Sequence, residues 1–172
     1  MKDNNRKKNI LLTAVLLLII AIIAAVLIII SLNIQNKTNS PVPDYSADDV
    51  AVKVIGKMNY KNLIPISSEN ISKYYDVPKG LVSDSAMYIS NRSDTGTEVA
   101  CFKLENSNDE KKLLGIISEY TSSKISNYKN VNDTSVQSRT DVIYPYVFVV
   151  ISSDTDNAVT AFQNVIQTDN DD

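Results

Sequence analysis

The feature that most constrains this chain is an apolar run over residues 10–32. Only Thr13 and Ser31 are polar within it, and it contains no charged residue. At about 1.5 Å of rise per residue, a helix of this length crosses a hydrocarbon core about 30 Å thick. The run is apolar on every side, which disfavours a core helix of a soluble domain. It therefore predicts a transmembrane anchor.

Two other export signals have apolar cores, and the flanks of the run argue against both. A cleaved signal peptide has a core of roughly 7–15 residues followed by small residues at the cleavage site. This run is longer, and the Ser31-Leu32-Asn33 stretch at its end lacks a pair of small residues. A lipoprotein signal would place a cysteine directly after the core, whereas the one cysteine of the chain is Cys101. We therefore expect an uncleaved anchor that contacts the lipid bilayer through residues 10–32.

Basic residues around the run predict its orientation. The tail over residues 1–9 carries Lys2, Arg6, Lys7 and Lys8, whereas only Lys37 follows the run closely. Positive residues are retained on the cytoplasmic side of a membrane. The sequence therefore predicts a single-pass protein of the cell membrane, with a cytoplasmic N-terminus and an extracytoplasmic C-terminal domain.

Composition excludes several functions for the exported part. Beyond the basic tail the chain has 13 basic and 19 acidic residues, a net charge of −6, which disfavours binding to nucleic acid. The chain has no histidine, so it lacks the commonest general base near neutral pH and the commonest zinc ligand. A single cysteine excludes an intramolecular disulfide. Phosphate-binding loops and metal-ligand spacings are also missing, and we predict no cofactor, no metal site and no catalytic residue.

Hydrophobic periodicity divides the exported part into a polar spacer over 33–44, one domain over 45–167 and an acidic tail over 168–172. Within the domain we expect helices that begin near Ser46, Ser67, Ser107 and Asp154, and strands over 81–90, 98–104, 135–142 and 146–151. Leu63-Ile64-Pro65 is interpreted as a turn before the second helix. The run over 146–151 is continuously apolar and is expected to be buried on both faces. The order α-α-β-β-α-β-β-α predicts an α+β fold, an antiparallel sheet with helices packed on one face.

Four segments of this domain carry a pattern that resembles a known family. They are Tyr75-Asp76-Val77, the segment from Val82 and Asp84 to Met87-Tyr88-Ile89-Ser90, residues 97–103 (TEVACFK) and residues 146–150 (YVFVV). Together they resemble a family of domains of unknown function in exported lipoproteins and single-span membrane proteins of Gram-positive, clostridia-like bacteria. The resemblance covers about residues 46–166 and implies a fold and a location, but no mechanism. The family usually has a glycine-containing turn where this chain has Ile143-Tyr144-Pro145.

Four residues are candidates for function. Asp84 and Glu98 are expected to approach one another across the hairpin formed by strands 81–90 and 98–104, and paired carboxylates can perform acid–base chemistry. The alternative is that both are exposed or lie at strand ends. Tyr144 and Tyr146 flank Pro145, where we expect a special turn or an edge position, with ligand contact through the two tyrosines as the alternative.

Two further motifs have simpler interpretations. Cys101 lies between apolar neighbours and has no histidine to activate it, which favours an inert core residue over a nucleophile. Asp154-Thr155-Asp156-Asn157 resembles the start of a calcium loop, but the glycine and the distant glutamate of such loops are missing. Helix capping explains this segment better.

The sequence leaves three functions open. The leading interpretation is a non-enzymatic, membrane-anchored binding or adaptor module for another component of the cell envelope, most simply a protein. The alternatives are an enzyme that acts on a cell-wall polymer through Asp84 and Glu98, and an anchored structural subunit of a membrane complex.

Overall fold

The computed structural model describes residue 23 and the ranges 42–91, 96–132 and 136–168. The chain divides into two compact units, Met1–Pro41 and Val42–Asp172, and the elements below belong to the second. The predicted cytoplasmic tail, the anchor except Ile23, most of the spacer and nearly all of the acidic tail lie outside the described residues. Among the helices that are described, none has the length and hydropathy needed to cross a membrane.

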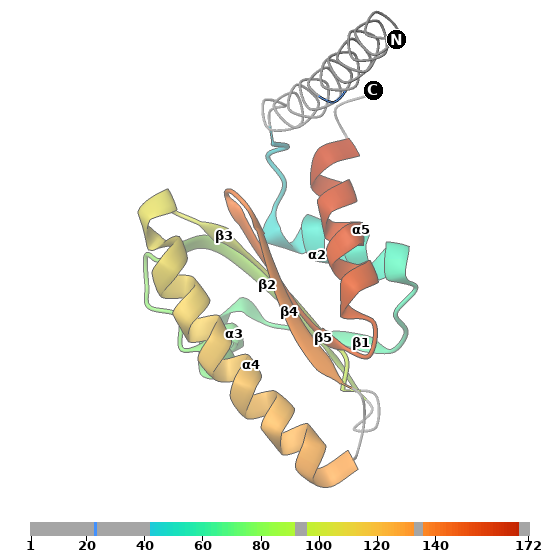
Figure 1. Ribbon diagram of the computed structural model, residues 1–172. Coiled ribbons are helices and arrows are strands. Elements are labelled where there is room, and N and C mark those ends of the chain that lie inside the picture. The colour runs from blue at the N-terminus through green and yellow to red at the C-terminus, as the bar shows by residue number, and fades with distance from the viewer. Residues whose placement is uncertain (1–22, 24–41, 92–95, 133–135, 169–172) are drawn as a thin grey trace, which may run out of the picture. The chain divides into compact units, whose positions relative to one another are not determined.

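The described part of the second unit is an α+β fold with a five-stranded antiparallel sheet and four helices (Figure 1). In chain order its elements are α2 (Ala47–Met58), β1 (Leu63–Ile66), α3 (Ser68–Tyr75), β2 (Val82–Ser90), β3 (Glu98–Leu104), the short 3₁₀ helix η1 (Ser107–Asp109), α4 (Glu110–Asn132), β4 (Gln137–Ile143), β5 (Tyr146–Ser152) and α5 (Thr155–Thr168). The strands lie in the order β1-β2-β3-β5-β4, and every neighbouring pair is antiparallel. Strands β1 and β4 are therefore the edges.

Helices cover both faces of the sheet, so the prediction of helices on one face is wrong (Figure 1). Helices α2 and α5 pack on one face, where Phe148 and Phe162 stack with ring centroids 4.9 Å apart. Helices α3 and α4 pack on the other, where Leu113 and Ile117 are buried against Phe102 of β3. The reason lies in β3 and β5, whose side chains are mostly apolar on both faces of the sheet. Helices must therefore pack on both faces to bury this apolar surface.

Strand β5 confirms the prediction from its continuous apolar run, because every residue from Tyr146 to Ser152 is buried. Strand β1 was not predicted. Its four residues pair with Met87–Ser90 of β2, although Pro65 favours a turn when the sequence is considered alone. Proline is tolerated in an edge strand, where its missing N–H does not interrupt a ladder on both sides.

Helix α2 begins as the sequence predicts. The Ser46 side chain accepts a hydrogen bond from the Asp49 backbone N–H, and the Asp49 carboxylate accepts one from the Ser46 N–H, which completes a capping box. The predicted apolar stripe is buried at Ala47, Val50, Ala51 and Val54. This stripe places α2 on the sheet with its polar side outward.

Candidate functional site

The most polar feature of the interior is a buried carboxylate at the start of β3. Glu98 is only 2% exposed and lies on the sheet face that α3 and α4 cover. The Tyr75 hydroxyl of α3 donates to Glu98 Oε1 at 2.8 Å, and the Tyr120 hydroxyl of α4 donates to Oε2 at 2.9 Å. Lys124 Nζ lies 3.6 Å from the same Oε2. These four residues, the Glu98 cluster, connect two helices and the sheet through one side chain.

Burial and hydrogen bonding shift the pKa of Glu98 in opposite directions. Burial raises the pKa of Glu98 above its usual range, while the Lys124 ammonium and the two tyrosine hydroxyls oppose that rise. Burial and the nearby carboxylate also raise the pKa of Tyr75 and of Tyr120, so both phenols remain protonated donors. The cluster is thus a satisfied polar network, in which each carboxylate oxygen has a donor.

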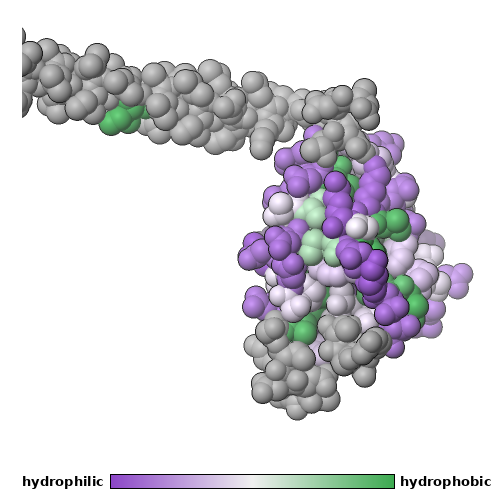
Figure 2. Space-filling view, turned by 90° about the vertical axis from the view of Figure 1, so that its right-hand side faces the viewer, coloured by the Kyte–Doolittle hydropathy of each residue, from purple (hydrophilic) through white to green (hydrophobic). Residues whose placement is uncertain are grey.

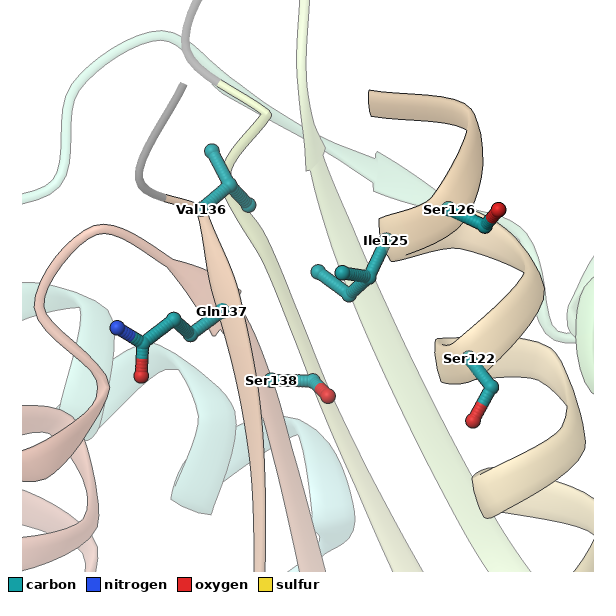
Figure 3. Close-up of a pocket in the computed structure, with 6 residues that line it drawn as sticks. All are labelled: Ser122, Ile125, Ser126, Val136, Gln137 and Ser138. Carbon is teal, nitrogen blue, oxygen red and sulfur yellow. The ribbon is translucent and has the colours of Figure 1, made fainter. Parts of the chain in front are cut away.

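Helix α4 runs over this cluster with a groove on each side. The groove toward β4 has a volume of about 470 Å³ and is lined by Ser122, Ile125, Ser126, Val136, Gln137 and Ser138 (Figure 3). In this serine groove, Ile125 of α4 and Ser138 of β4 point into the gap from opposite sides, while Gln137 points away (Figure 3). Its lining carries hydroxyl and apolar groups and no charge.

The second groove lies between α3 and α4. It has a volume of about 300 Å³ and is lined by Tyr74, Tyr75, Asp76, Ile116, Glu119, Tyr120 and Ser123. The Tyr120 ring lies 4.2 Å from the Tyr75 ring and 6.4 Å from the Tyr74 ring, centroid to centroid. This tyrosine groove therefore differs from the serine groove in being aromatic and acidic.

Strand β4 supplies an open edge beside the serine groove. Ser138, Thr140 and Val142 pair with Ile151, Val149 and Val147 of β5 and share their face, the one under α4. The two charged residues of the strand point to the other face, where Arg139 lies 3.2 Å from Asp156 and Asp141 accepts from Gln163 at 2.9 Å. The groove side of β4 is therefore uncharged, and alternate residues along the strand direct their backbone N–H and C=O groups outward.

The opposite side of the molecule offers less for a partner to recognise. Its surface over α2 and α5 is mostly hydrophilic, with hydrophobic residues scattered among polar ones (Figure 2). Val52 of α2 is 47% exposed. Scattered apolar residues are normal on a protein surface and do not mark an interface.

Asp84 and Glu98 do not form the predicted carboxylate pair. Asp84 pairs with Lys103 near one end of the β2–β3 hairpin, whereas Glu98 pairs with Ile89 near the other end. They also occupy opposite faces, since Asp84 contacts α2 and Glu98 contacts α3 and α4. An acid–base mechanism shared by these two side chains therefore has no geometric basis.

Asp84 instead holds the start of α2. Its Oδ2 accepts a hydrogen bond from the Ala47 backbone N–H at 2.7 Å, and its Oδ1 accepts one from the Ser85 N–H at 2.8 Å. An anionic group at a helix N-terminus is favoured by the helix dipole. Asp84 thereby fastens the first residue of α2 to β2.

Tyr146 and Lys103 fasten the connecting segment, residues 42–46, which precedes α2. The Tyr146 hydroxyl lies 2.8 Å from the carbonyl oxygens of both Pro43 and Tyr45. Lys103 forms an ion pair with Asp44 and donates to the Tyr45 carbonyl at 3.0 Å. The segment over 42–44, predicted as spacer, is therefore packed on the domain.

The remaining candidates have structural positions. Tyr144 is 47% exposed and precedes Pro145 in the two-residue turn between β4 and β5, and the bond between them is cis, so the expected special turn is present. Cys101 is fully buried, and burial raises the pKa of its thiol, with a smaller contribution from Asp84. Asp154 accepts a hydrogen bond from the Asn157 amide at the start of α5. No group of potential metal ligands occurs among the described residues.

Sequence reasoning missed three members of the Glu98 cluster. Tyr75, Tyr120 and Lys124 come from two different helices, and only their packing on β3 brings them to one carboxylate. One signal was available, because Tyr120 and Lys124 are four residues apart and so share a helix side. Comparisons with protein-family models, with curated proteins and with solved structures find no match to this chain.

Proposed function

We propose that this protein is a membrane-anchored, extracytoplasmic binding module that captures an extended segment of another envelope protein. The bound segment adds to the sheet as a sixth strand along the β4 edge, with its side chains on one side directed into the serine groove. The observation that carries this proposal is the groove of about 470 Å³ directly beside an edge strand. The apolar run over residues 10–32 and the basic residues before it support the anchored location.

The two edges of the sheet differ in a way that favours β4 as the docking edge. Strand β1 is only four residues long, so it presents a short edge. Pro65 within it has no backbone N–H to donate to an added strand. Strand β4 has seven residues and no proline. At about 3.4 Å per residue, it presents roughly 24 Å of edge, enough for a peptide of about six or seven residues.

The chemistry of the serine groove specifies the kind of segment that fits. Main-chain hydrogen bonds to β4 require only an extended backbone, so they provide affinity without selecting a sequence. The groove therefore determines which side chains of the bound segment are preferred. Ile125 supplies an apolar contact there, and Ser122 and Ser138 supply hydroxyl groups. A segment with small apolar or uncharged polar side chains at alternate positions satisfies this lining, because a buried charge would find no partner there.

A photo-crosslinking experiment in the native cell tests this proposal. The photoreactive residue p-benzoylphenylalanine replaces Ser122, which is exposed at the groove, and in a matched control it replaces Val52, which is exposed on α2. We expect a discrete protein adduct from position 122 and none from position 52. Adducts of equal yield at both positions would contradict the proposal, as would an adduct from position 122 that contains carbohydrate and no polypeptide.

A further inference from the structure

The tyrosine groove combines aromatic rings with acidic groups. Tyr74 and Tyr120 are half-buried and line it together with the buried Tyr75. Two carboxylates, those of Asp76 and Glu119, also line it, and no basic side chain does. Aromatic faces carry negative electrostatic potential, so the rings and the carboxylates favour the same kind of ligand.

The two carboxylates are available to a ligand. Asp76 and Glu119 are both exposed, and neither forms an ion pair or a side-chain hydrogen bond with any residue in the part of the chain that the structure describes. The ammonium of Lys124 lies 5.7 Å from the centroid of the Tyr120 ring, but it faces the carboxylate of Glu98. The charge of this nearby lysine is therefore compensated before any ligand arrives.

The groove is also held in shape before a ligand binds. Tyr120 is anchored by its hydrogen bond to Glu98, and Tyr75 by its bond to the other oxygen of that carboxylate. Asp76 ends α3 in the left-handed conformation, with a φ of 49°, and its N–H donates to the Ser72 carbonyl. Fixed rings and a fixed helix end lower the ordering cost of binding.

We propose that the tyrosine groove binds the cationic side chain of a lysine or arginine on a partner protein. The charge complementarity of a groove with two carboxylates and no basic lining selects a cation, and the half-buried rings of Tyr74 and Tyr120 select an organic one. Its volume of about 300 Å³ admits one long side chain lying along the rings. This site differs from the strand-addition site in its lining residues and in its ligand, and it goes beyond the proposed function.

Nuclear magnetic resonance of the full chain in a non-ionic detergent, with ¹³C-labelled tyrosine, tests this proposal directly. The probes are the N-acetyl methylamides of lysine and arginine, and the neutral controls are the same derivatives of norleucine and citrulline. We expect the ring signals of Tyr74 and Tyr120 to shift with the cationic probes, at an affinity at least about fivefold above that for the neutral ones. Equal affinity for cationic and neutral probes would overturn the proposal.

Charge-removing variants locate the site. The double variant Asp76→Asn/Glu119→Gln removes both carboxylates of the groove while keeping side-chain size, and asparagine tolerates the left-handed conformation of position 76. We expect its affinity for the lysine probe to fall at least about threefold. The control Glu69→Gln/Glu105→Gln removes two exposed carboxylates that do not line the groove and should leave the affinity unchanged.

Two results would refute this location or this ligand. If both double variants weaken binding equally, the probe responds to the overall charge of the domain and not to the groove. If n-butylammonium binds more tightly than the lysine derivative, the site serves a free amine and not a protein side chain. Either result would leave crosslinking from position 122 unaffected, so failure of this inference is distinguishable from failure of the strand-addition proposal.

Discussion

Replacing Glu98 by alanine should destabilise the protein by about 1–3 kcal/mol. Four contributions set this magnitude. Tyr75 is 1% exposed, so its hydroxyl would lose its acceptor without access to water, at a cost of about 1–3 kcal/mol. Tyr120 is partly exposed and Lys124 has 31% of its side chain exposed. Water can therefore hydrate both groups and replace most of the interaction energy that they lose with the Glu98 carboxylate. The space left by the carboxyl group adds about 1 kcal/mol, and relief from burying a charged group offsets part of the total.

Equilibrium unfolding of the full chain in non-ionic detergent, with urea and circular dichroism, measures this change. Glu105→Ala is the matched control, because Glu105 is exposed just after β3 and should change stability by no more than about 0.5 kcal/mol. A Glu98→Ala variant within about 0.5 kcal/mol of the wild type would refute the reasoning. That result would mean that the cluster makes no net contribution to the folded state.

Four further predictions concern pH and the residues that the sequence singled out. Burial raises the pKa of Glu98 above its ordinary value of 4.5, so its contribution to stability is present below pH 4.5 and is lost as pH rises through the raised pKa. In the same urea assay, the stability of wild type relative to Glu98→Gln should therefore fall as pH rises above 4.5, and a rise would contradict this. Asp84→Ala should cost about 1–2 kcal/mol by freeing the Ala47 N–H, whereas a change below about 0.5 kcal/mol would leave Asp84 without the structural role assigned to it. Tyr146→Phe should speed proteolysis of the connecting segment without abolishing folding, and an unchanged cleavage rate would argue against this anchor. Cys101 should react with a maleimide only at the rate of unfolding, and fast labelling of the native chain would contradict its burial.

Local chemistry allowed accurate prediction where neighbouring residues determine the structure. The capping box of Ser46 and Asp49 is complete within four residues, so the start of α2 follows from the sequence alone. The continuous apolar run of β5 likewise predicts that the strand is buried on both faces, as the structure shows. Strand β1 escaped prediction because its pairing with β2 outweighs the local preference of Pro65, and this pairing depends on distant residues.

The error over Asp84 and Glu98 has a geometric cause. In an antiparallel hairpin, the first residue of the second strand pairs with the end of the first strand, so Glu98 lies opposite Ile89 and far from Asp84. Side chains alternate between faces along a strand, and this alternation also separates the two carboxylates. The Glu98 cluster itself was beyond prediction, since it depends on how α3 and α4 pack on the sheet.

Neither groove was predicted, because each forms between elements that are distant in sequence. The serine groove needs the C-terminal half of α4 beside the start of β4, and the tyrosine groove needs the end of α3 beside the middle of α4. Helix and strand assignments do not specify these distances. Charge gave a partial indication, since a net charge of −6 beyond residues 1–9 favours cationic partners.

Amide hydrogen exchange along β4 tests the central claim of strand addition most directly. The measurement compares the full chain purified in detergent with the same chain in membranes prepared from the native cell. We predict that the peptides covering Gln137–Ile143 exchange faster in the purified chain than in the native membranes, because the outward amides of β4 gain hydrogen bonds there, whereas the other edge, Leu63–Ile66, stays unchanged. Equal exchange of β4 in both preparations, or protection confined to β1, would contradict the account.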